Sequence, residues 1–285
     1  MPRRKISTVL QSVPTLEGAG VHLKRAFGYN QTPHFDPFLL LDDFHSDNPA
    51  DYIAGFPWHP HRGIETITYI LEGRVEHGDS MGNQGVIAAG DVQWMTAGSG
   101  IIHQELPQKT ASGRMWGFQL WANLPANQKM MAPRYREIKA SEIPQVTLAS
   151  GATVRIISGE VAGIRGPVRE IVIDPLLIDV TVPAGVEFIL PVKEGYTLFV
   201  YLLAGSGSFD SEEKLFGPEN VLLFAHEGTE LRVAAATELR FLLCSGKPLK
   251  EPIAWKGPIV MNSDAELRTA FAEYQQGTFI KDAAQ

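Results

Sequence analysis

Short apolar segments, each followed by a glycine-containing turn, recur through the first half of the chain. The β-rich runs cover residues 65–71, 86–88, 92–95 and 116–121. The turn signals between them are Gly73, Gly78-Asp79, Gly82-Asn83 and Gly90-Asp91. Many short strands with frequent turns are typical of a β-sandwich or β-barrel. The pattern therefore predicts an all-β fold.

One helix is predicted near the end of the chain. Ser263-Asp-Ala-Glu266 is a capping box, in which a serine side chain and a glutamate three residues later satisfy the first backbone N–H groups. Apolar residues follow at helical spacing before a closing glycine, namely Leu267, Ala270, Phe271, Tyr274 and Gly277. We expect this helix to pack on the outside of a β core.

The second half of the chain partly repeats the first. Residues 190–205 align with residues 58–73 when Gly205 is set on Gly73. This register places Pro191 opposite His59, and it places a lysine opposite His61. The repeat thus keeps the strand and turn pattern but loses the histidines. Repetition at so long a period indicates duplicated domains, because the repeats of solenoids are far shorter.

The candidate chemistry lies in two spaced pairs, His59 with His61 and His103 with Glu105. Residues i and i+2 of a strand point to the same face, so each pair can direct two ligand atoms at one point. Pro60 favours extended backbone at His59 and has no N–H for a sheet ladder, which predicts a sheet edge. Two such strands facing each other would form a metal site.

Three imidazoles and one carboxylate favour iron, manganese, nickel, copper or zinc over magnesium and calcium. A closed structural zinc site is the competing interpretation, but such sites usually contain cysteine. The other histidines are expected to be ordinary surface or core residues, including His77, which lies just past the ligand strand. They are His22, His34, His45, His77 and His226.

Composition sets further limits. The 285 residues exceed the usual size of a single core, which favours two domains. A net charge of −7 argues against direct nucleic-acid binding. The chain has no membrane-length apolar run and no signal-peptide pattern at its start, so we expect a cytoplasmic protein without a membrane segment. The single cysteine, Cys244, is expected to be a small core residue.

Three runs closely resemble the pirin family of the cupin superfamily. They are residues 35–44, 55–66 and 90–105, and the similarity continues to Gly257-Pro-Ile-Val-Met-Asn262. The resemblance implies a bicupin, with two stacked β-barrel (double-stranded β-helix) domains and a C-terminal helix. It also implies one metal in the first barrel, most often iron as Fe(II), with the ligands His59, His61, His103 and Glu105.

The resemblance implies two kinds of function. Some pirins open the central ring of the flavonol quercetin with O2 and release carbon monoxide. In that reaction Glu105 would act as general base as well as ligand, and the partners would be a small planar aromatic substrate and O2. Other pirins are iron-dependent regulators that bind a transcription factor or a metabolic enzyme. We therefore expect the dioxygenase, with the protein-binding regulator as the alternative, and a monomeric chain.

Several residues near the predicted site have two interpretations. Most cupins take their glutamate ligand from the strand that carries the paired histidines, which makes Glu65 the alternative to Glu105. Trp58 is unusual, since pirins often carry a small acidic residue there. Asp42, Asp43 and Arg62 are either partners of the ligands or solvent-facing ion pairs. The nearby aromatic residues are either barrel core or the wall of a ligand pocket, namely Phe56, Trp94, Phe118 and Trp121.

The predicted domains follow from the repeat. Residues 1–130 form the metal-binding cupin domain, residues 131–145 form a linker, and residues 146–285 form the second cupin domain without a metal site. The terminal helix is assigned to the second domain. Its return to the first domain is left open, because the sequence contains no signal for it.

Overall fold

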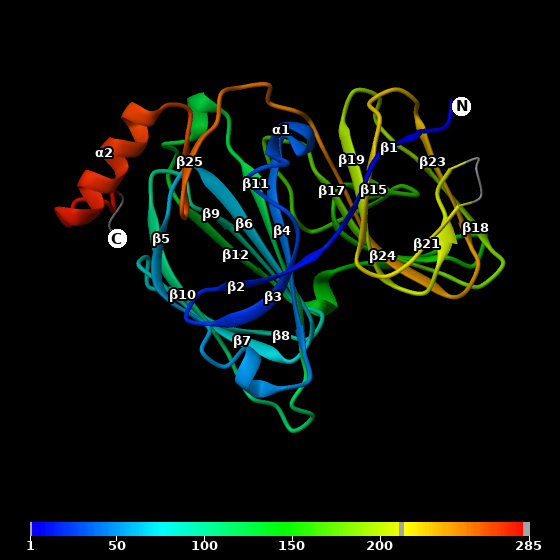
Figure 1. Ribbon diagram of the computed structural model, residues 1–285, viewed down its shortest axis with the longest axis horizontal. Coiled ribbons are helices and arrows are strands. Elements are labelled where there is room, and N and C mark those ends of the chain that lie inside the picture. The colour runs from blue at the N-terminus through cyan, green and yellow to red at the C-terminus, as the bar shows by residue number, and fades with distance from the viewer. Residues whose placement is uncertain (1, 211–213, 282–285) are drawn as a thin grey trace. The chain divides into compact units, whose positions relative to one another are not determined.

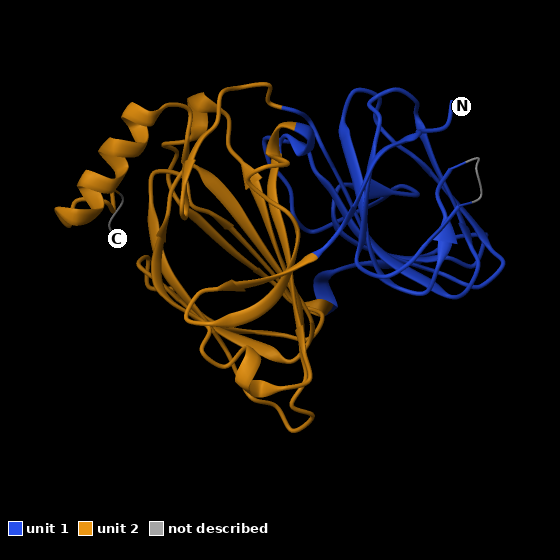
Figure 2. Cartoon of the chain, viewed as in Figure 1, with its two compact units in different colours: residues 1–12, 34–37, 141–248 blue, residues 13–33, 38–140, 249–285 orange. Residues whose placement is uncertain are grey.

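The computed structural model describes residues 2–210 and 214–281, and β-strands dominate it (Figure 1). These residues form two compact units (Figure 2). Unit 1 comprises residues 1–12, 34–37 and 141–248, and unit 2 comprises residues 13–33, 38–140 and 249–285. The terminal helix thus lies in unit 2, and the first residues of the chain lie in unit 1. The contiguous ranges predicted from the sequence differ from the units in both terminal segments, in residues 34–37, and at the predicted linker, which is divided between the units.

Unit 2 contains two antiparallel sheets. The larger has the strand order β12-β9-β6-β11-β4-β3-β2, and the smaller has the order β5-β10-β7-β8. The strands of the larger sheet span, in that order, Arg134–Ile138, Val92–Thr96, Ile64–Glu72, Met115–Asn123, Phe38–Ser46, Val21–Phe27 and Val13–Glu17. Those of the smaller sheet span Phe56–His61, Ile101–Pro107, Arg74–Asp79 and Gln84–Ala88. A hairpin of β25 (Ala254–Lys256) and β26 (Ile259–Met261) precedes helix α2 (Asp264–Gln275).

Unit 1 repeats this arrangement. Its larger sheet has the order β1-β22-β19-β24-β17-β14-β13, with strands spanning Ile6–Gln11, Asn220–Phe224, Thr197–Ala204, Leu239–Gly246, Leu176–Val182, Thr153–Ser158 and Gln145–Thr147. Its smaller sheet, β18-β23-β20-β21, spans Glu187–Pro191, Glu230–Ala235, Gly207–Ser208 and Leu215–Phe216. A short hairpin pairs β15 (Glu160–Val161) with β16 (Ile164–Arg165).

The short helices of the two units are α1 (Thr32–Phe35), η1 (Pro49–Asp51), η2 (Ala126–Gln128) and η3 (Ala140–Glu142).

The local sequence explains the strands that carry the predicted site. In β10, burial alternates along the strand, so Ile101, His103 and Glu105 face the interior. Strand β5 lies at the edge of its sheet, as Pro60 predicts. The all-β prediction is confirmed, because every β-rich run named above lies within a strand.

The two barrels have the same strand order but different interiors. In unit 2, several inward-facing positions on the strands of the larger sheet carry polar side chains. The same positions of unit 1 carry apolar residues that belong to its core. By strand register, Asp42, Thr68, Gln93 and Gln119 correspond to Ile178, Val200, Leu222 and Leu243. The second barrel is therefore filled with hydrocarbon, and its stability comes from burying it.

The alignment of the repeat is wrong by one residue at the ligand strand. Strand β5 pairs with β10 so that His59 faces His103, and β18 pairs with β23 so that Leu190 faces Leu231. Leu190, not Pro191, therefore occupies the place of His59. Pro191 and Lys193 are exposed. The connection from β18 to β19 is longer than that from β5 to β6, which moves the register.

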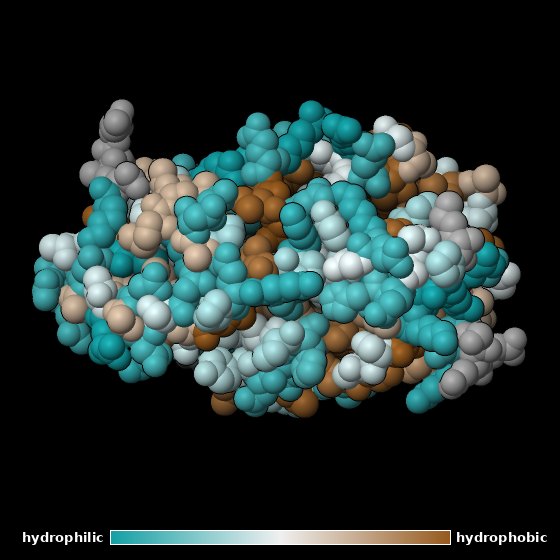
Figure 3. All heavy atoms as spheres, turned by 90° about the horizontal axis from the view of Figure 1, so that it is seen from above, coloured by the Kyte–Doolittle hydropathy of each residue, from teal (hydrophilic) through white to brown (hydrophobic). Residues whose placement is uncertain are grey.

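Helix α2 forms as its capping box predicts. The Ser263 hydroxyl accepts a hydrogen bond from the Glu266 backbone N–H at 3.3 Å, and it donates one to the Glu266 carboxylate at 2.8 Å. Leu267 and Ala270 are buried against β26, in a cluster that includes Ile259 and Phe279. Cys244 is also buried, as predicted. The face shown in Figure 3 is mostly hydrophilic, in keeping with a net charge of −7.

Candidate metal centre

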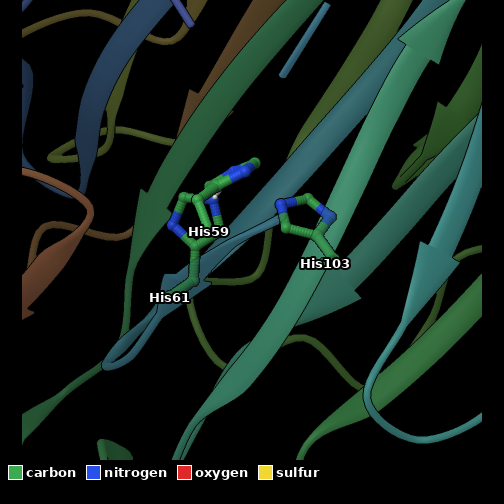
Figure 4. Close-up of side chains that lie close together, drawn as sticks. All are labelled: His59, His61 and His103. Atoms are coloured by element: carbon green, nitrogen blue, oxygen red, sulfur yellow. Dashed lines mark hydrogen bonds between the residues drawn. The ribbon is translucent and has the colours of Figure 1, made fainter. Parts of the chain in front are cut away.

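His59, His61 and His103 come together inside unit 2 (Figure 4). Strand β5 supplies the first two and β10 supplies the third, and His103 pairs directly with His59 across the ladder. Their candidate ligand nitrogens all lie within 4.8 Å of one another. The predicted convergence of these histidines is therefore present.

Hydrogen bonds fix the orientation of two of the rings. His59 Nδ1 lies 2.8 Å from the Pro57 carbonyl oxygen, and His61 Nδ1 lies 3.0 Å from the Pro258 carbonyl oxygen. Because a carbonyl can only accept, Nδ1 must carry the hydrogen in both rings. The Nε2 atoms of neutral rings then present lone pairs, and these two atoms are 3.1 Å apart. Two facing lone pairs call for a cation or a proton between them.

His103 strengthens the argument for a cation. It is fully buried, and neither ring nitrogen has a hydrogen-bond partner within the described part of the chain. A buried polar group without a partner is costly, so such a group suggests a ligand. Burial, followed by the neighbouring imidazoles, holds the pKa of His61 and of His103 well below the usual value for histidine. The His61 and His103 rings are thus neutral, as metal ligands must be, and the residues fit a transition-metal ion.

Glu105 and Glu65 lie in different surroundings. Glu105 lies two residues after His103 on β10, and its oxygens accept hydrogen bonds from Thr68 Oγ1 at 2.9 Å and Gln119 Nε2 at 3.0 Å. Glu65 instead accepts from Thr96 Oγ1 at 2.6 Å, and Arg134 lies 4.0 Å away. Because Glu65 and Thr68 are three residues apart on β6, they point to opposite faces of the strand. Glu65 therefore points away from the face that meets Glu105.

A cavity of about 590 Å³ opens beside the histidines. His59, His61 and Glu105 are among the residues that line it. Its aromatic lining continues from His61 to Trp121, then to Trp255 and Tyr29, with successive ring centroids 5.0, 5.8 and 5.5 Å apart. A few polar groups within a mostly apolar wall are typical of a small-molecule site.

The charged groups of the cavity are largely paired. Arg25 donates two hydrogen bonds to Asp42, at 2.8 and 2.7 Å, and lies 2.9 Å from Glu17. Such a bidentate ion pair fixes the orientation of both side chains. The alternative of a solvent-facing pair is wrong for Asp42, which is buried, and for Arg62, which is 2% exposed. Asp43 is buried as well.

The structure also separates the aromatic residues into core and wall. Trp94 and Phe118 are buried core residues, whereas Phe56 and Trp121 line the cavity. Trp58 is exposed at 53% and does not line the cavity.

Of the remaining histidines, all but one are exposed, as expected: His22, His34, His45 and His226. His77 is buried and has its own hydrogen-bond partners. Its ring nitrogens lie 3.3 Å from Asp79 and 2.7 Å from Gln93, and its ring centroid lies 5.5 Å from that of His103. It therefore packs behind His103 as a satisfied core residue.

Several residues of this site were not predicted from the sequence. Thr68 and Gln119 lie on predicted strands, but the strand register that joins them to Glu105 is not readable from one sequence. Trp255 and Pro258 come from the C-terminal segment, far along the chain. The Gly257-Pro258 pair belonged to a run that resembles the family, yet nothing in that run signalled contact with His61.

Comparisons with known proteins agree with this architecture. The family model described as Pirin matches residues 20–122, and the one described as Pirin C-terminal cupin domain matches residues 177–280. A pirin-like protein of Caulobacter vibrioides is 44% identical over 98% of this chain and 100% of the relative. The chain belongs to the pirin family. Its two cupin domains and its C-terminal helix are those expected from the resemblance.

Two further proteins extend the comparison. A crystal structure described as quercetin 2,3-dioxygenase from Acinetobacter baumannii superposes with a TM-score of 0.90 at 33% identity, covering 99% of this pirin and 100% of that chain. Human pirin is 36% identical over 95% of this chain and 92% of its own length. Within the described residues, no helix is long and apolar enough to span a bilayer.

Proposed function

We propose that this pirin is a metal-dependent dioxygenase that opens the central ring of a flavonol such as quercetin with O2 and releases carbon monoxide. The observation that carries the proposal is the convergence of three imidazoles beside an aromatic-walled cavity, with His103 lacking a hydrogen-bond partner among the described residues. The solved relative described as a quercetin 2,3-dioxygenase supports the same activity.

The proposed ligands are His59, His61, His103 and Glu105, and the proposed ion is Fe(II). Manganese, nickel, copper and zinc suit the same nitrogen and oxygen donors. When bound, such an ion supplies Lewis-acid chemistry, which lowers the pKa of a coordinated hydroxyl, and open positions for small ligands. Glu105 is preferred to Glu65 as the fourth ligand because it shares the inward face of β10 with His103.

Glu105 is also the proposed proton acceptor. Its two oxygens are held by neutral donors, Thr68 and Gln119, so they keep lone pairs for a substrate hydroxyl. Trp121 Nε1 lies 3.3 Å from Gln119 Oε1 and therefore orients the amide that holds the carboxylate. A flavonol hydroxyl placed at this end of the cavity can transfer its proton to a Glu105 oxygen.

The aromatic wall suits a planar substrate. Trp121, Trp255 and Tyr29 offer ring faces and edges along the cavity, and aromatic rings pack against each other in offset or edge-to-face arrangements. A flat ligand along this wall would displace water from the histidine end. Its hydroxyl would then meet Glu105 in a site of low polarity.

Anaerobic loading followed by oxygen admission tests the proposal directly. Fully Fe(II)-loaded protein is mixed with quercetin, O2 is admitted, and flavonol absorbance, O2 uptake and carbon monoxide are measured. We expect equimolar loss of flavonol and O2 in the wild type. His61→Ala should lose both metal and turnover, whereas the control His226→Ala, at an exposed position, should keep both. If fully Fe(II)-loaded wild type does not consume the flavonol, the proposal is wrong.

The second candidate is a metal-dependent regulator that binds a protein partner. It is supported by unit 1, whose barrel interior is filled with apolar residues. Such a barrel has no inward-facing polar groups for catalysis at these positions, but its outer surface can bind a partner. In this proposal, the charge and geometry of the metal site alter a binding surface. Partner capture by wild type, but not by His61→Ala, together with no flavonol turnover, would favour it. A monomeric state and a cytoplasmic location stay predictions under either function.

A further inference from the structure

The C-terminal segment, residues 249–281, packs against the turn between the ligand strand β5 and β6. Val260 N–H donates to the Arg62 carbonyl at 3.1 Å, and Arg62 forms an isolated bridge with Ile259. Gly63 has a positive φ of 78°, and a Cβ there would lie 2.0 Å from the Val260 carbonyl oxygen. Only glycine permits so close an approach. The segment and the end of β5 are thus in direct backbone contact.

Side chains strengthen this attachment. The buried Arg62 guanidinium lies 2.6 Å from Glu273 Oε2 of helix α2 and donates to the Phe279 carbonyl at 2.7 Å. It also lies 4.2 Å from the centroid of the Phe279 ring. A buried charge is costly unless it is paired and hydrogen-bonded, so these contacts hold the Arg62 guanidinium in place. The residue that follows His61 is therefore held by the last helix and the residues after it.

The same segment reaches His61 itself. The loop of the β25–β26 hairpin, Gly257-Pro258, presents the Pro258 carbonyl to His61 Nδ1 at 3.0 Å. Trp255 Nε1 donates to the Gly257 carbonyl at 2.7 Å and so braces this loop. The hydrogen bond places the hydrogen on Nδ1 and leaves the Nε2 lone pair free to point at the other histidines.

We propose that the C-terminal segment is a positioning element of the metal centre, with the Pro258 carbonyl fixing the tautomer and ring orientation of His61. Pro258 is thus a positioning residue that acts through its backbone. The proposal rests on the metal site of the proposed function but does not depend on which substrate that site takes. Groups that orient a metal-ligating histidine typically change metal affinity about 10–100-fold when they are lost.

A glycine substitution can disturb the loop without filling space. Gly257 has a φ of +55°, and a Cβ there would meet nothing within 4 Å, so Gly257→Ala strains only the backbone that presents Pro258. The matched control is Gly163→Ala in the β15–β16 hairpin of unit 1. Gly163 has a φ of +79°, also with nothing within 4 Å, and its hairpin loop has the same length.

A second variant tests the brace. Trp255→Phe keeps an aromatic ring but removes the N–H that binds the Gly257 carbonyl. Its control is Trp116→Phe, because Trp116 Nε1 has no hydrogen-bond partner within the described residues. The two pairs together separate loss of loop geometry from general strain and from loss of ring volume.

The probe is Co²⁺, whose visible absorption reports ligand geometry, and its affinity is measured against a competing chelator in the full-length protein. We expect Gly257→Ala to bind Co²⁺ about 10–100-fold more weakly than wild type with an altered spectrum. Trp255→Phe should show a smaller loss in the same direction. Both controls should match wild type. Thermal unfolding of the metal-free proteins verifies that each variant is folded.

The outcomes separate this inference from the proposed function. If Gly257→Ala and Trp255→Phe are folded and bind Co²⁺ with wild-type affinity and spectrum, the positioning role is overturned while the metal site stands. If wild type itself binds no Co²⁺, the metal site and this inference both fall. Lack of flavonol turnover in a protein that binds Co²⁺ as expected overturns only the dioxygenase.

Discussion

At the residue scale, the decisive feature is the set of partners around each ionisable side chain. His59 and His61 each have one ring nitrogen bonded to a carbonyl, which leaves the other free for a ligand. Glu105 is held by neutral donors, whereas Glu65 lies near an arginine. The two glutamates therefore differ in the groups that contact their carboxylates, and experiment can distinguish them.

The first prediction concerns these glutamates. Glu105→Gln should weaken metal binding by about 10-fold or more and abolish turnover, because it removes the anionic donor proposed as the fourth ligand. Glu65→Gln should leave metal affinity within about threefold of wild type, since Glu65 points to the opposite face of β6. Metal titration and oxygen uptake on both variants provide the measurement. The reverse ranking would make Glu65 the ligand.

At the element scale, the C-terminal segment and the loop after β11 are joined through a buried lysine. Lys129 Nζ donates to the Gly63 carbonyl at 2.9 Å, Asn123 Oδ1 at 2.7 Å and the Val260 carbonyl at 3.1 Å. One side-chain nitrogen thus contacts acceptors from β11, the β5–β6 turn and β26. Its removal should loosen all of these elements together.

The second prediction is that Lys129→Met destabilises the protein. The substitution leaves buried acceptors without their donor, and each such acceptor costs about 1–3 kcal/mol, so we expect a loss of at least about 2 kcal/mol in the free energy of unfolding. The control Lys139→Met removes a lysine that is 47% exposed, and it should cost less than about 1 kcal/mol. Chemical denaturation of both variants measures the difference. Equal effects would contradict the role of Lys129.

The third prediction concerns pH. Burial lowers the pKa of Lys129 to about 7, opposed by the more distant Glu251 and Glu266. The unfolded chain keeps the ordinary lysine pKa of about 10.4, so between these values the unfolded state binds more protons than the folded state. The contribution of Lys129 to stability should therefore rise with pH above about 7. Unfolding of wild type and Lys129→Met at pH 7, 8 and 9 measures it, and a difference that does not change with pH would refute the shift.

At the scale of the whole molecule, the two barrels share one strand order but differ in the side chains that fill their interiors. The strand orders of the units match, yet inward-facing polar positions of unit 2 are apolar in unit 1. Each unit also takes a segment from the far end of the sequence. Strand β1 pairs with β22 in unit 1, and the C-terminal segment completes unit 2.

The fourth prediction follows from this exchange of ends. Removal of residues 1–12 leaves the edge of β22 unpaired, so amide hydrogen exchange should increase in β22 while β5 and β10 stay protected. Removal of residues 249–285 should do the reverse, raising exchange in β5 and releasing metal. Hydrogen-exchange mass spectrometry on the two truncated chains provides the measurement. Increased exchange in the same strands for both truncations would contradict the division into units.

How much of this could be read from the sequence depends on the range of the interactions involved. The strands, the capped helix and the duplication depend on local periodicity, which a single sequence displays. The spaced pairs also follow from local geometry, because alternate residues of a strand share a face. The alignment of Pro191 with His59 failed because one longer loop moves a strand register without a trace in local pattern.

The sequence by itself determined the fold class and the residues His59, His61 and His103 as a metal-capable group, because both are encoded by short-range patterns and by donor chemistry. Only the tertiary structure decided which groups surround them. The Pro258 carbonyl, the Trp255 ring and the Gln119 amide reach the site through contacts between distant segments. Such contacts depend on packing and strand register, which no spacing rule along the chain specifies.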